Sequence, residues 1–523
     1  MTTTTTETPS HSSTARKILW NTISQIIGKA FIAVLGIVIV KMITNYLGAK
    51  GYGEYSVTFD FLTFFTIVAD MGLYTIGVRE MAKDSEKTEM IMGNILTIRT
   101  IASIIMIGVG CIAAFYIPSY QGTHIPIAIC IAGTAMLFNI LTSTISAVLQ
   151  VNLKMQYNSF ASVVGKVITV GYMVFIIYAI NPGTTEGLYQ MVWGGVAGNG
   201  AMLLVTYYYS SKLTKIRYRL DWVFWKDVIV KALPYGFALI LNNAYFRIGA
   251  VLLSIIKTPT EAGIYGVPMD ILEAVGIIPL YFMNSVLPVL TRSLERKDGS
   301  HQKIIQFAFD FLVMGSLPLI AGTVALAYPI IYLVSSPEFL TNYSIGFIGS
   351  DTVLQILIFA LAFSFINSLF GFILVADNRQ MKILTRNAFG ALLTVLLDIL
   401  LIPYFSIRAA ASVNVITECY VAVASYFIAK KYIKFKIKLG NTFKTLICAV
   451  VMGLVVYFLK EPTYHYIQNK NIFVLIPLGV VVYGIMLLVT KTITPEMMAI
   501  ARKPKPIPAD AQKKMPEDDK FNF

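Results

Sequence analysis

Long apolar runs, separated by short clusters of glycine, proline and charged residues, fill nearly the whole chain. Each run is about as long as the roughly 20 apolar residues that a transmembrane helix needs. A membrane β-barrel would instead alternate apolar and polar residues in segments of about ten. The pattern predicts an all-α polytopic membrane protein with about fourteen helices, near residues 18–46, 53–80, 90–117, 125–152, 156–180, 187–211, 226–256, 262–292, 303–334, 351–376, 381–403, 407–431, 442–459 and 471–491.

Composition supports the same fold class. Of the 523 residues, 56% are hydrophobic and 13% are charged, about half the charged share of a soluble domain. This excludes a soluble or nucleic-acid-binding protein, despite a net charge of +14. The four cysteines lie inside apolar runs without metal-ligand spacing, so we expect neither disulfides nor a metal site.

Lysine and arginine gather in alternate connections between the predicted helices, which sets the orientation. The basic connections hold Arg79, Lys83 and Lys87; Lys212, Lys215, Arg217, Arg219 and Lys226; Arg292, Arg296 and Lys303; Arg379, Lys382 and Arg386; and the lysines of 430–444. The opposite connections hold only Lys50, Lys257, Arg408, Lys460 and Lys470. We therefore expect a multi-pass protein of the cell membrane with both termini in the cytoplasm.

Two short sequence matches, each six predicted helices apart, indicate an internal repeat. Residues Gly53–Leu62 match Gly263–Leu272, and Asn139–Lys154 match Asn367–Lys382. An even number of helices between matches predicts two parallel six-helix repeats related by an axis along the membrane normal. The expected parts are a disordered N-terminus at 1–15, an N-lobe at 16–211, a cytoplasmic linker at 212–225, a C-lobe at 226–432, two extra helices within 433–491, and a disordered tail at 492–523.

Polar and ionisable residues inside the predicted spans indicate a wet interior, because each costs several kcal/mol in hydrocarbon unless it faces a cavity or a partner. The candidates for substrate binding in a cavity are Asn21, Gln25, Lys29, Arg99, Lys166, Asn243 and Arg247. The candidates for ion coupling are Asp60, Asp70, Asp270, Glu273 and Glu418.

These candidates admit more than one interpretation. Lys29, Arg99 and Arg247 either line a cavity or form structural ion pairs. The acids either couple an ion, pair with the cations, or cap helices. Asp70 is the first candidate for coupling, because Gly72 beside it lets a neighbouring helix approach closely.

Enzymatic activity is not expected. The four histidines lie in predicted tails or loops, and no HExxH, GxSxG or phosphate-loop motif occurs. The connections on the poorly charged side are short, with no room for a catalytic domain. We expect no catalytic residues, no bound metal, and no cofactor other than a coupled proton or sodium ion.

Three motifs resemble those of a known family. Leu47–Tyr55, Asp70–Leu73 and Val78–Asp84 look like the N-terminal signature of Wzx-type oligosaccharide flippases, within the MATE-like MOP exporter superfamily. The segment from Asn367 to Lys382 resembles the end of that family's tenth helix. The resemblance covers the first twelve predicted helices.

The resemblance implies two six-helix lobes forming a V around a central cavity, and alternating access. The implied substrate is a lipid-linked, polyprenyl-diphosphate oligosaccharide, moved from the cytoplasmic to the outer leaflet for cell-surface polysaccharide biosynthesis. The implied partners are membrane lipids and a polymerase or glycosyltransferases, with no nucleic acid, and the chain is expected to be a monomer.

Three alternatives remain open. One is a lipid II flippase, because the last two helices resemble those of fourteen-helix members. Another is a MATE-type multidrug or cation exporter, which would need a net-negative cavity with aromatic walls. The third is a scaffold or polymerase without transport, which would not need charges buried in both lobes.

Overall fold

The structure is a computed structural model that describes residues 11–492, except Ser85, Leu153, Pro182, 297–298 and Asn378. Inside helices, the side chains of 11–27, 30, 184–185, 234–235, 238–239, 242–246 and 380 also lie outside the description. The side chains of Asn21, Gln25 and Asn243 therefore cannot be placed. The predicted tails at 1–15 and 492–523 fall almost wholly outside the described residues.

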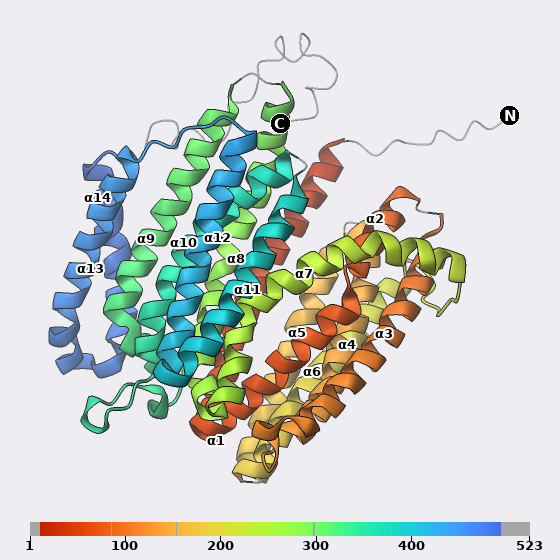
Figure 1. Ribbon diagram of the computed structural model, residues 1–523, viewed down its shortest axis with the longest axis horizontal. Helices are drawn as coiled ribbons and strands as arrows, with labels where there is room; N and C mark the ends of the chain where they lie inside the picture. Colours follow the sequence, from red (N-terminus) through yellow and green to blue (C-terminus); the bar gives the residue numbers. More distant parts are fainter. Residues whose placement is uncertain are drawn as a thin grey trace.

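The first half of the described chain forms a bundle of helices, as its apolar runs predict (Figure 1). Its α-helices are α1 (His11–Asp70), α2 (Leu73–Lys83), α3 (Thr88–Tyr116), α4 (Ile125–Val151), α5 (Met155–Phe175) and α6 (Thr184–Ser211). Glycine with a positive φ marks several ends, as at Gly72 before α2, where φ is 78°.

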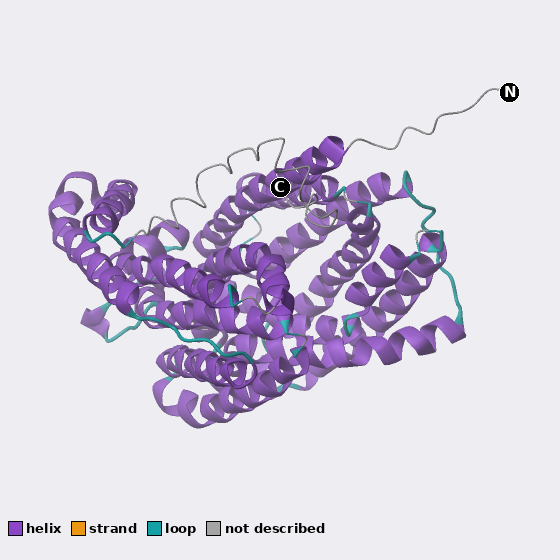
Figure 2. Ribbon diagram, turned by 90° about the horizontal axis from the view of Figure 1, so that it is seen from above, coloured by secondary structure: helices purple, strands orange, loops and turns teal. Residues whose placement is uncertain are grey.

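The second half forms another bundle, with two more helices beside it (Figure 1). Its α-helices are α7 (Trp222–Ile256), α8 (Pro259–Arg296), α9 (His301–Val334), α10 (Ser350–Ala376), α11 (Gln380–Phe405), α12 (Ile407–Tyr432), α13 (Gly440–Ile467) and α14 (Ile472–Val489). Figure 2 shows the described residues as helices joined by short turns and loops.

Ten stretches of the described residues are long and apolar enough to cross a membrane, so this is a multi-pass membrane protein. That number differs from the expected fourteen for identifiable reasons. The stretches Phe31–Lys83 and Gly440–Val489 hold 53 and 50 residues, more than one crossing needs. Helices α6 and most of α7 are not among the ten.

The first two predicted helices, 18–46 and 53–80, are divided differently in the structure. Helix α1 continues through both, with a kink at Gly48, where φ is 67°. The break comes instead at Met71 and Gly72. The apolar pattern marked a loop at the glycines near 48–53, but glycine at a positive φ lets the helix resume after one residue.

The helices of the two halves pair in the same order along the chain. Helix α4 packs on α3 and α6, and α10 packs on α9 and α12. Helix α5 packs on α1 and α6, and α11 packs on α7 and α12. Helices α13 and α14 pack on α9, outside both bundles (Figure 1). The halves meet where α1 contacts α7 and α8.

The ends of the helices define two opposite faces of the molecule. The basic face carries the connections Lys212–Asp221, between Arg296 and His301, and Ile433–Leu439. In Figure 1 Ile433–Leu439 runs along the upper left, and Lys212–Asp221 lies at the right. The opposite face carries the α1 kink, Pro118–Tyr120, and the connection between α9 and α10. The two bundles diverge from the opposite face toward the basic face (Figure 1).

Candidate functional site

A cavity of about 460 Å³ lies in the middle of the molecule, mainly within the first bundle. Helices α1, α4, α5 and α6 form most of its wall, and α7 and α8 contribute one residue each. The lining polar and charged residues are Tyr52, Tyr55, Ser56, Asp60, Asn139, Ser162, Lys166, Thr169, Asn199, Arg247 and Asp270. The site therefore offers hydroxyl, amide and charged groups in one enclosed space, as expected from a wet interior.

Glycines bring α5 and α6 into close contact beside this cavity. A Cβ on Gly165 would lie 2.8 Å from the carbonyl oxygen of Gly198, and a Cβ on Gly198 would lie 1.9 Å from Thr169 Oγ1. Real Cβ atoms do not approach that closely, so glycine is required at both positions. Since Lys166 follows Gly165 directly, this crossing fixes where the lysine leaves the helix.

Lys166 differs from the other cation of the cavity in its contacts. Within the described part of the chain, Lys166 forms neither a hydrogen bond nor an ion pair, although it lines the cavity. A half-buried ammonium group is costly without a partner. Lys166 is therefore positioned to bind an anionic group that enters the cavity.

Arg247 is held between acids from both halves of the molecule. Its Nη1 lies 2.5 Å from Asp60 Oδ1 on α1, and its Nη2 lies 2.6 Å from Glu273 Oε1 on α8. Ser56 donates a hydrogen bond to the other oxygen of Asp60, at 3.3 Å. Arg247 thus combines the two interpretations that the sequence left open: it lines the cavity and it is ion-paired.

Asp270 completes the charged cluster. Its Oδ2 accepts a hydrogen bond of 2.6 Å from the Tyr52 hydroxyl, which joins α8 to α1. The cavity wall therefore carries two acids, Asp60 and Asp270, against two cations, Lys166 and Arg247. Glu273 lies in a small adjoining pocket. The site is not dominated by cations, and its charge depends on the protonation of its acids.

Arg99 and Asp70 lie away from this cavity and pair with each other. Arg99 Nη2 is 2.6 Å from Asp70 Oδ1, and the arginine side chain is only 4% exposed. Arg99 also donates to the hydroxyls of Thr144 and Ser143 on α4, at 2.5 and 3.1 Å. The arrangement ties the end of α1 to α3 and α4. A coupling role for Asp70 stays a prediction.

Two further candidates are also outside the cavity wall. Lys29 is exposed, and its Nζ lies 4.6 Å from the centre of the Tyr281 ring on α8. This cation–π contact connects the two halves. Glu418 is buried in α12, at 1% exposure, where α12 packs on α10 and α11. Neither residue lines the described cavity.

Polar contacts join the two halves at the opposite face. Lys41 Nζ on α1 donates to the carbonyl oxygens of Tyr332 and Ser335, at 2.7 and 2.5 Å, at the end of α9. Glu338 Oε2 accepts from the Ala49 backbone N–H, at 3.0 Å, directly after the α1 kink. Each charge lies at a helix end of favourable polarity, the carboxylate at newly exposed N–H groups and the ammonium at carbonyls.

Tight packing adds to these contacts. The Tyr120 hydroxyl is 2.8 Å from Ser254 Oγ, and Ser119 donates to the Ile255 carbonyl oxygen at 2.6 Å. A Cβ on Gly53 of α1 would lie 1.8 Å from the Pro259 carbonyl oxygen at the start of α8, and one on Gly263 would lie 2.7 Å from Gly53 Cα. The glycines of the two matched segments therefore touch, and the two halves are in direct backbone contact at this face.

The sequence did not single out several residues of the site. Tyr52, Ser56, Asn139 and Asn199 were not among the candidates, yet all line the cavity. Tyr52 and Ser56 lie on the same helical face as Asp60, four residues apart, which is a usable signal. No such sequence signal marks Asn199, because it lies in a helix rich in glycine and tyrosine.

Comparison with known proteins places this fold and site in a family. The model of the family described as "Polysaccharide biosynthesis protein" matches residues 15–294, more than half of the chain. The chain belongs to this family. The matched part contains α2 to α7 and nearly all of α1 and α8, and thus every residue named above as lining the cavity.

Solved structures show the fold of this family member. A structure of the lipid II flippase MurJ in an inward closed conformation is 13% identical, with a TM-score of 0.65, and the match covers 92% of this chain and 100% of that one. An inward-facing multidrug resistance MATE transporter of the MOP superfamily is 12% identical, with a TM-score of 0.61, covering 78% and 97%. A MOP superfamily transporter from Pyrococcus furiosus, described as having a binding pocket of reverse polarity, is 15% identical, with a TM-score of 0.55, covering 79% and 95%.

These findings confirm the resemblance seen in the motifs. The chain belongs to the polysaccharide biosynthesis family, and its fold is that of the solved MurJ and MATE structures. No curated protein sequence matches the chain. The substrate and the roles of individual residues follow from neither comparison.

Proposed function

We propose that this protein is a flippase for a lipid-linked, polyprenyl-diphosphate oligosaccharide. It would move the glycan headgroup from the cytoplasmic to the outer leaflet by alternating access, for cell-surface polysaccharide biosynthesis. The observation that carries the proposal is Lys166, a cation without a partner among the described residues, in a cavity rich in hydroxyls and amides. Such a site can bind an anionic, polyhydroxylated headgroup.

The physical argument concerns the headgroup. Hydrocarbon excludes a diphosphate and its sugars, so a polar cavity must take the place of water while the polyprenyl tail stays in lipid. Lys166 would form charge-assisted hydrogen bonds to phosphate. Ser162, Asn139 and Asn199 would hydrogen-bond sugar hydroxyls.

We also propose how the helices are arranged in the membrane. The contact between Gly53 and Gly263, and the matching helix pairs in both halves, support two parallel six-helix lobes followed by two extra helices. This arrangement has about fourteen crossings and places both termini in the cytoplasm, with the basic face cytoplasmic. The structure then corresponds to a state closed toward the outside.

We also propose that transport is coupled to an ion through the charge of the cavity. Moving the empty carrier back would be hindered by unneutralised charges. Protonation or a sodium ion at Asp60 or Asp270, beside Arg247, would change the cavity charge between the two half-cycles. We propose these two acids for the role. A polymerase or glycosyltransferases would supply and consume the substrate beside a monomeric flippase.

The test is replacement of the free cation. Lys166→Gln should abolish glycan export, while Lys166→Arg should retain a substantial part of it, because charge is kept. Export is measured by complementation of a glycan-export-deficient host, together with the abundance of the protein in membranes. Lys50→Gln, on an exposed residue at the opposite face, is the matched control.

Wild-type export by Lys166→Gln at normal abundance would overturn the proposed binding role. Loss of export with Lys166→Arg but not with Lys166→Gln would also contradict it, since the size of the side chain would then matter more than its charge.

Two other candidates each have an observation in their favour. A lipid II flippase is favoured by the MurJ structure, whose match extends over 92% of this chain. A cation exporter is favoured by Asp60 and Asp270 beside Tyr52, Tyr55 and Phe59 in the cavity wall. Vesicles containing the protein and, in turn, a lipid-linked oligosaccharide, lipid II or an organic cation distinguish the three by which compound is moved.

A further inference from the structure

In the connection between α12 and α13, Ile433–Leu439, more buried and exposed side chains alternate from Ile433 to Lys438. Ile433 and Phe435 are buried, at 5% and 3% exposure. Lys434, Lys436 and Lys438 are all exposed. Because alternate residues of an extended chain point the same way, the three lysines form a row with a repeat of about 6.6 Å. We call this row the lysine comb.

Two glutamine side chains of α9 fix the backbone of the comb. Gln302 accepts a 2.8 Å hydrogen bond from the Lys436 N–H and donates one of 2.6 Å to its carbonyl oxygen. Gln306 makes the same pair of contacts with Lys438, at 2.8 and 3.0 Å. These paired bonds reproduce the ladder of a β-sheet, with amide side chains in place of a second strand.

A buried carboxylate on α9 holds one of these two glutamines in place. Asp310 is 6% exposed, and its Oδ1 accepts a 2.9 Å hydrogen bond from Gln306. Its other oxygen accepts one of 3.0 Å from Asn441, at the start of α13. The comb is therefore held at both its α9 side and its α13 end. An ordinary solvated loop would need no such support.

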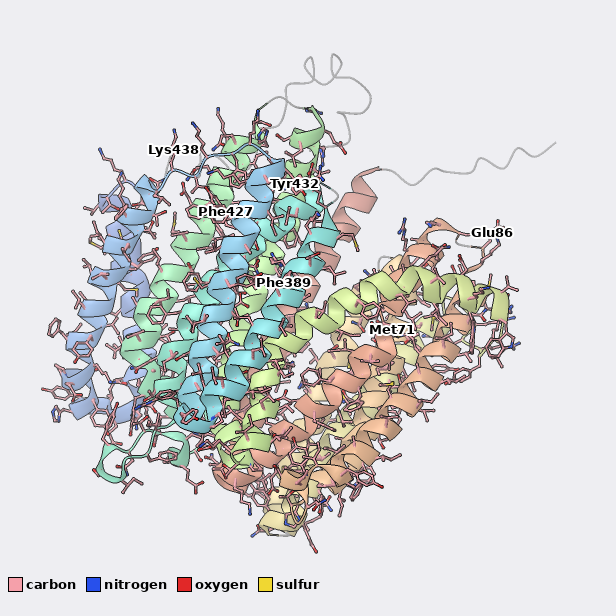
Figure 3. All side chains as sticks on the ribbon, in the orientation of Figure 1. Met71, Glu86, Phe389, Phe427, Tyr432 and Lys438 are labelled. Carbon is pink, nitrogen blue, oxygen red and sulfur yellow. The ribbon has the colours of Figure 1, made fainter. Side chains whose placement is uncertain are left out.

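The position of the comb indicates what it faces. Candidate membrane spans end at Tyr432 and begin again at Gly440, so the comb lies at the level where the chain leaves the membrane. It crosses the end of α9 on the basic face, where Lys438 and Tyr432 are labelled in Figure 3. Phospholipid headgroups surround the protein at that level.

We propose that the lysine comb is a binding surface for anionic phospholipid headgroups of the leaflet that borders the basic face. Because the backbone that carries the lysines is already fixed, binding several phosphates costs no further backbone entropy. Binding therefore costs less entropy than it would at a mobile loop. The inference depends on the chain crossing a membrane and not on which substrate it moves.

Lipid is a better match than an acidic protein partner. The exposed side of the comb is narrow, with one row of lysines and no exposed aromatic anchor between them. Protein interfaces depend on such buried anchors, whereas headgroup binding needs only cations at the membrane surface. Each lysine near an anionic surface strengthens binding by roughly fivefold.

The experiment measures lipid binding to the full-length protein. Purified protein is placed in nanodiscs of phosphatidylcholine with a graded fraction of phosphatidylglycerol, and phosphatidylglycerol enrichment around the protein is measured against salt concentration. The variant combines Lys434→Gln, Lys436→Gln and Lys438→Gln. The matched control combines Lys215→Gln, Lys226→Gln and Lys382→Gln, which removes the same charge from other exposed sites. We expect at least a tenfold weaker preference for phosphatidylglycerol in the comb variant and under twofold change in the control.

A second variant separates geometry from charge. Gln302→Ala with Gln306→Ala keeps all three lysines and frees the backbone, so an intermediate loss of preference is expected. Equal losses in the comb variant and its control would overturn the proposal, because net charge alone would then explain binding. An unchanged preference in the comb variant would overturn it too, and would leave an acidic protein segment as the partner of this row.

Discussion

Arg99 is the most deeply buried cation described in the first bundle, and its environment explains its role. Asp70, Thr144 and Ser143 all contact its guanidinium, and Tyr74 lies under it at 5.7 Å. Two charges placed inside a protein are tolerated only when paired and hydrogen-bonded. The pair therefore belongs to the framework that holds the cavity wall.

Breaking this pair should destabilise the protein without a direct effect on substrate. Arg99→Ala should cost about 3 kcal/mol, because it leaves the half-buried carboxylate of Asp70 without its partner. Arg99→Met combined with Asp70→Asn should recover much of that loss, since neither charge remains. Thermal unfolding in detergent measures both. The exposed pair Lys231–Asp227 is the control, and Lys231→Ala should change little. Equal stability of Arg99→Ala and wild type would contradict the framework role.

Arg247 is different, because it joins acids from both halves beside the cavity. Arg247→Ala should abolish transport and shift the pH dependence of any remaining activity, since Asp60 and Glu273 would face each other without a cation. Arg247→Lys should be partly active, because one ammonium group cannot hold two carboxylates in the same geometry. Flipping in vesicles with imposed proton or sodium gradients measures the effect. Full activity of Arg247→Ala in every gradient would exclude a role in coupling.

At the scale of helices, the contact between α1 and α8 depends on two glycines. Gly53 and Gly263 allow the two backbones to meet directly, and neither position has room for a Cβ. Tyr52, next to Gly53, then reaches Asp270 across the same crossing. The glycine contact thus sets the position of part of the charged cluster.

Adding a methyl group at this crossing should separate the helices. Gly53→Ala would place a Cβ 1.8 Å from the Pro259 carbonyl oxygen, so we expect a loss of about 1–3 kcal/mol and reduced transport. Gly108→Ala, where nothing lies within 4 Å of the added atom, is the matched control and should be neutral or slightly stabilising. Thermal unfolding and export assays on both variants test this. A neutral Gly53→Ala would show that the crossing is not tightly constrained.

Particular residues show which features of the fold and the site can be predicted from the sequence and which cannot. The helices follow from apolar runs because a bilayer makes length and hydropathy nearly sufficient. The match of Gly53 with Gly263 was visible in the sequence, but their contact was not, since it depends on how two lobes fold against each other. Lys166 and Arg247 were both candidates, and only the structure separates a cation without a described partner from one held by two acids. Gln302 and Gln306 look like ordinary surface residues in the sequence. No sequence pattern predicts that their side chains hydrogen-bond the backbone of the lysine comb.

At the scale of the whole molecule, the closed face depends on a few polar contacts near the α1 kink. Lys41 and Glu338 each contact backbone groups of the other half. Contacts this few can be lost and regained at a cost of a few kcal/mol, the range in which a protein populates two conformations.

Removing these contacts should favour opening of that face. Lys41→Ala with Glu338→Ala should increase, by several fold, the reaction of a reporter cysteine at Asn199 with a membrane-impermeant thiol reagent added from the opposite face. The reporter is placed in a variant without Cys111, Cys130, Cys419 and Cys448. Lys50→Ala, which removes a nearby exposed charge, should leave the reaction rate unchanged. An unchanged rate in the double variant would mean that packing alone keeps the face closed.

The meeting point of Gly53 and Gly263 also has a mechanical consequence. It lies close to one end of α8, so the rest of that helix acts as a lever arm of about 50 Å, at 1.5 Å per residue. A rotation of about ten degrees around this fulcrum would displace the far end of the helix by about 9 Å. The same rotation would barely move the near end. The basic side can therefore widen by several ångströms, whereas an opening of equal width on the other side requires the fulcrum itself to shift along the helices.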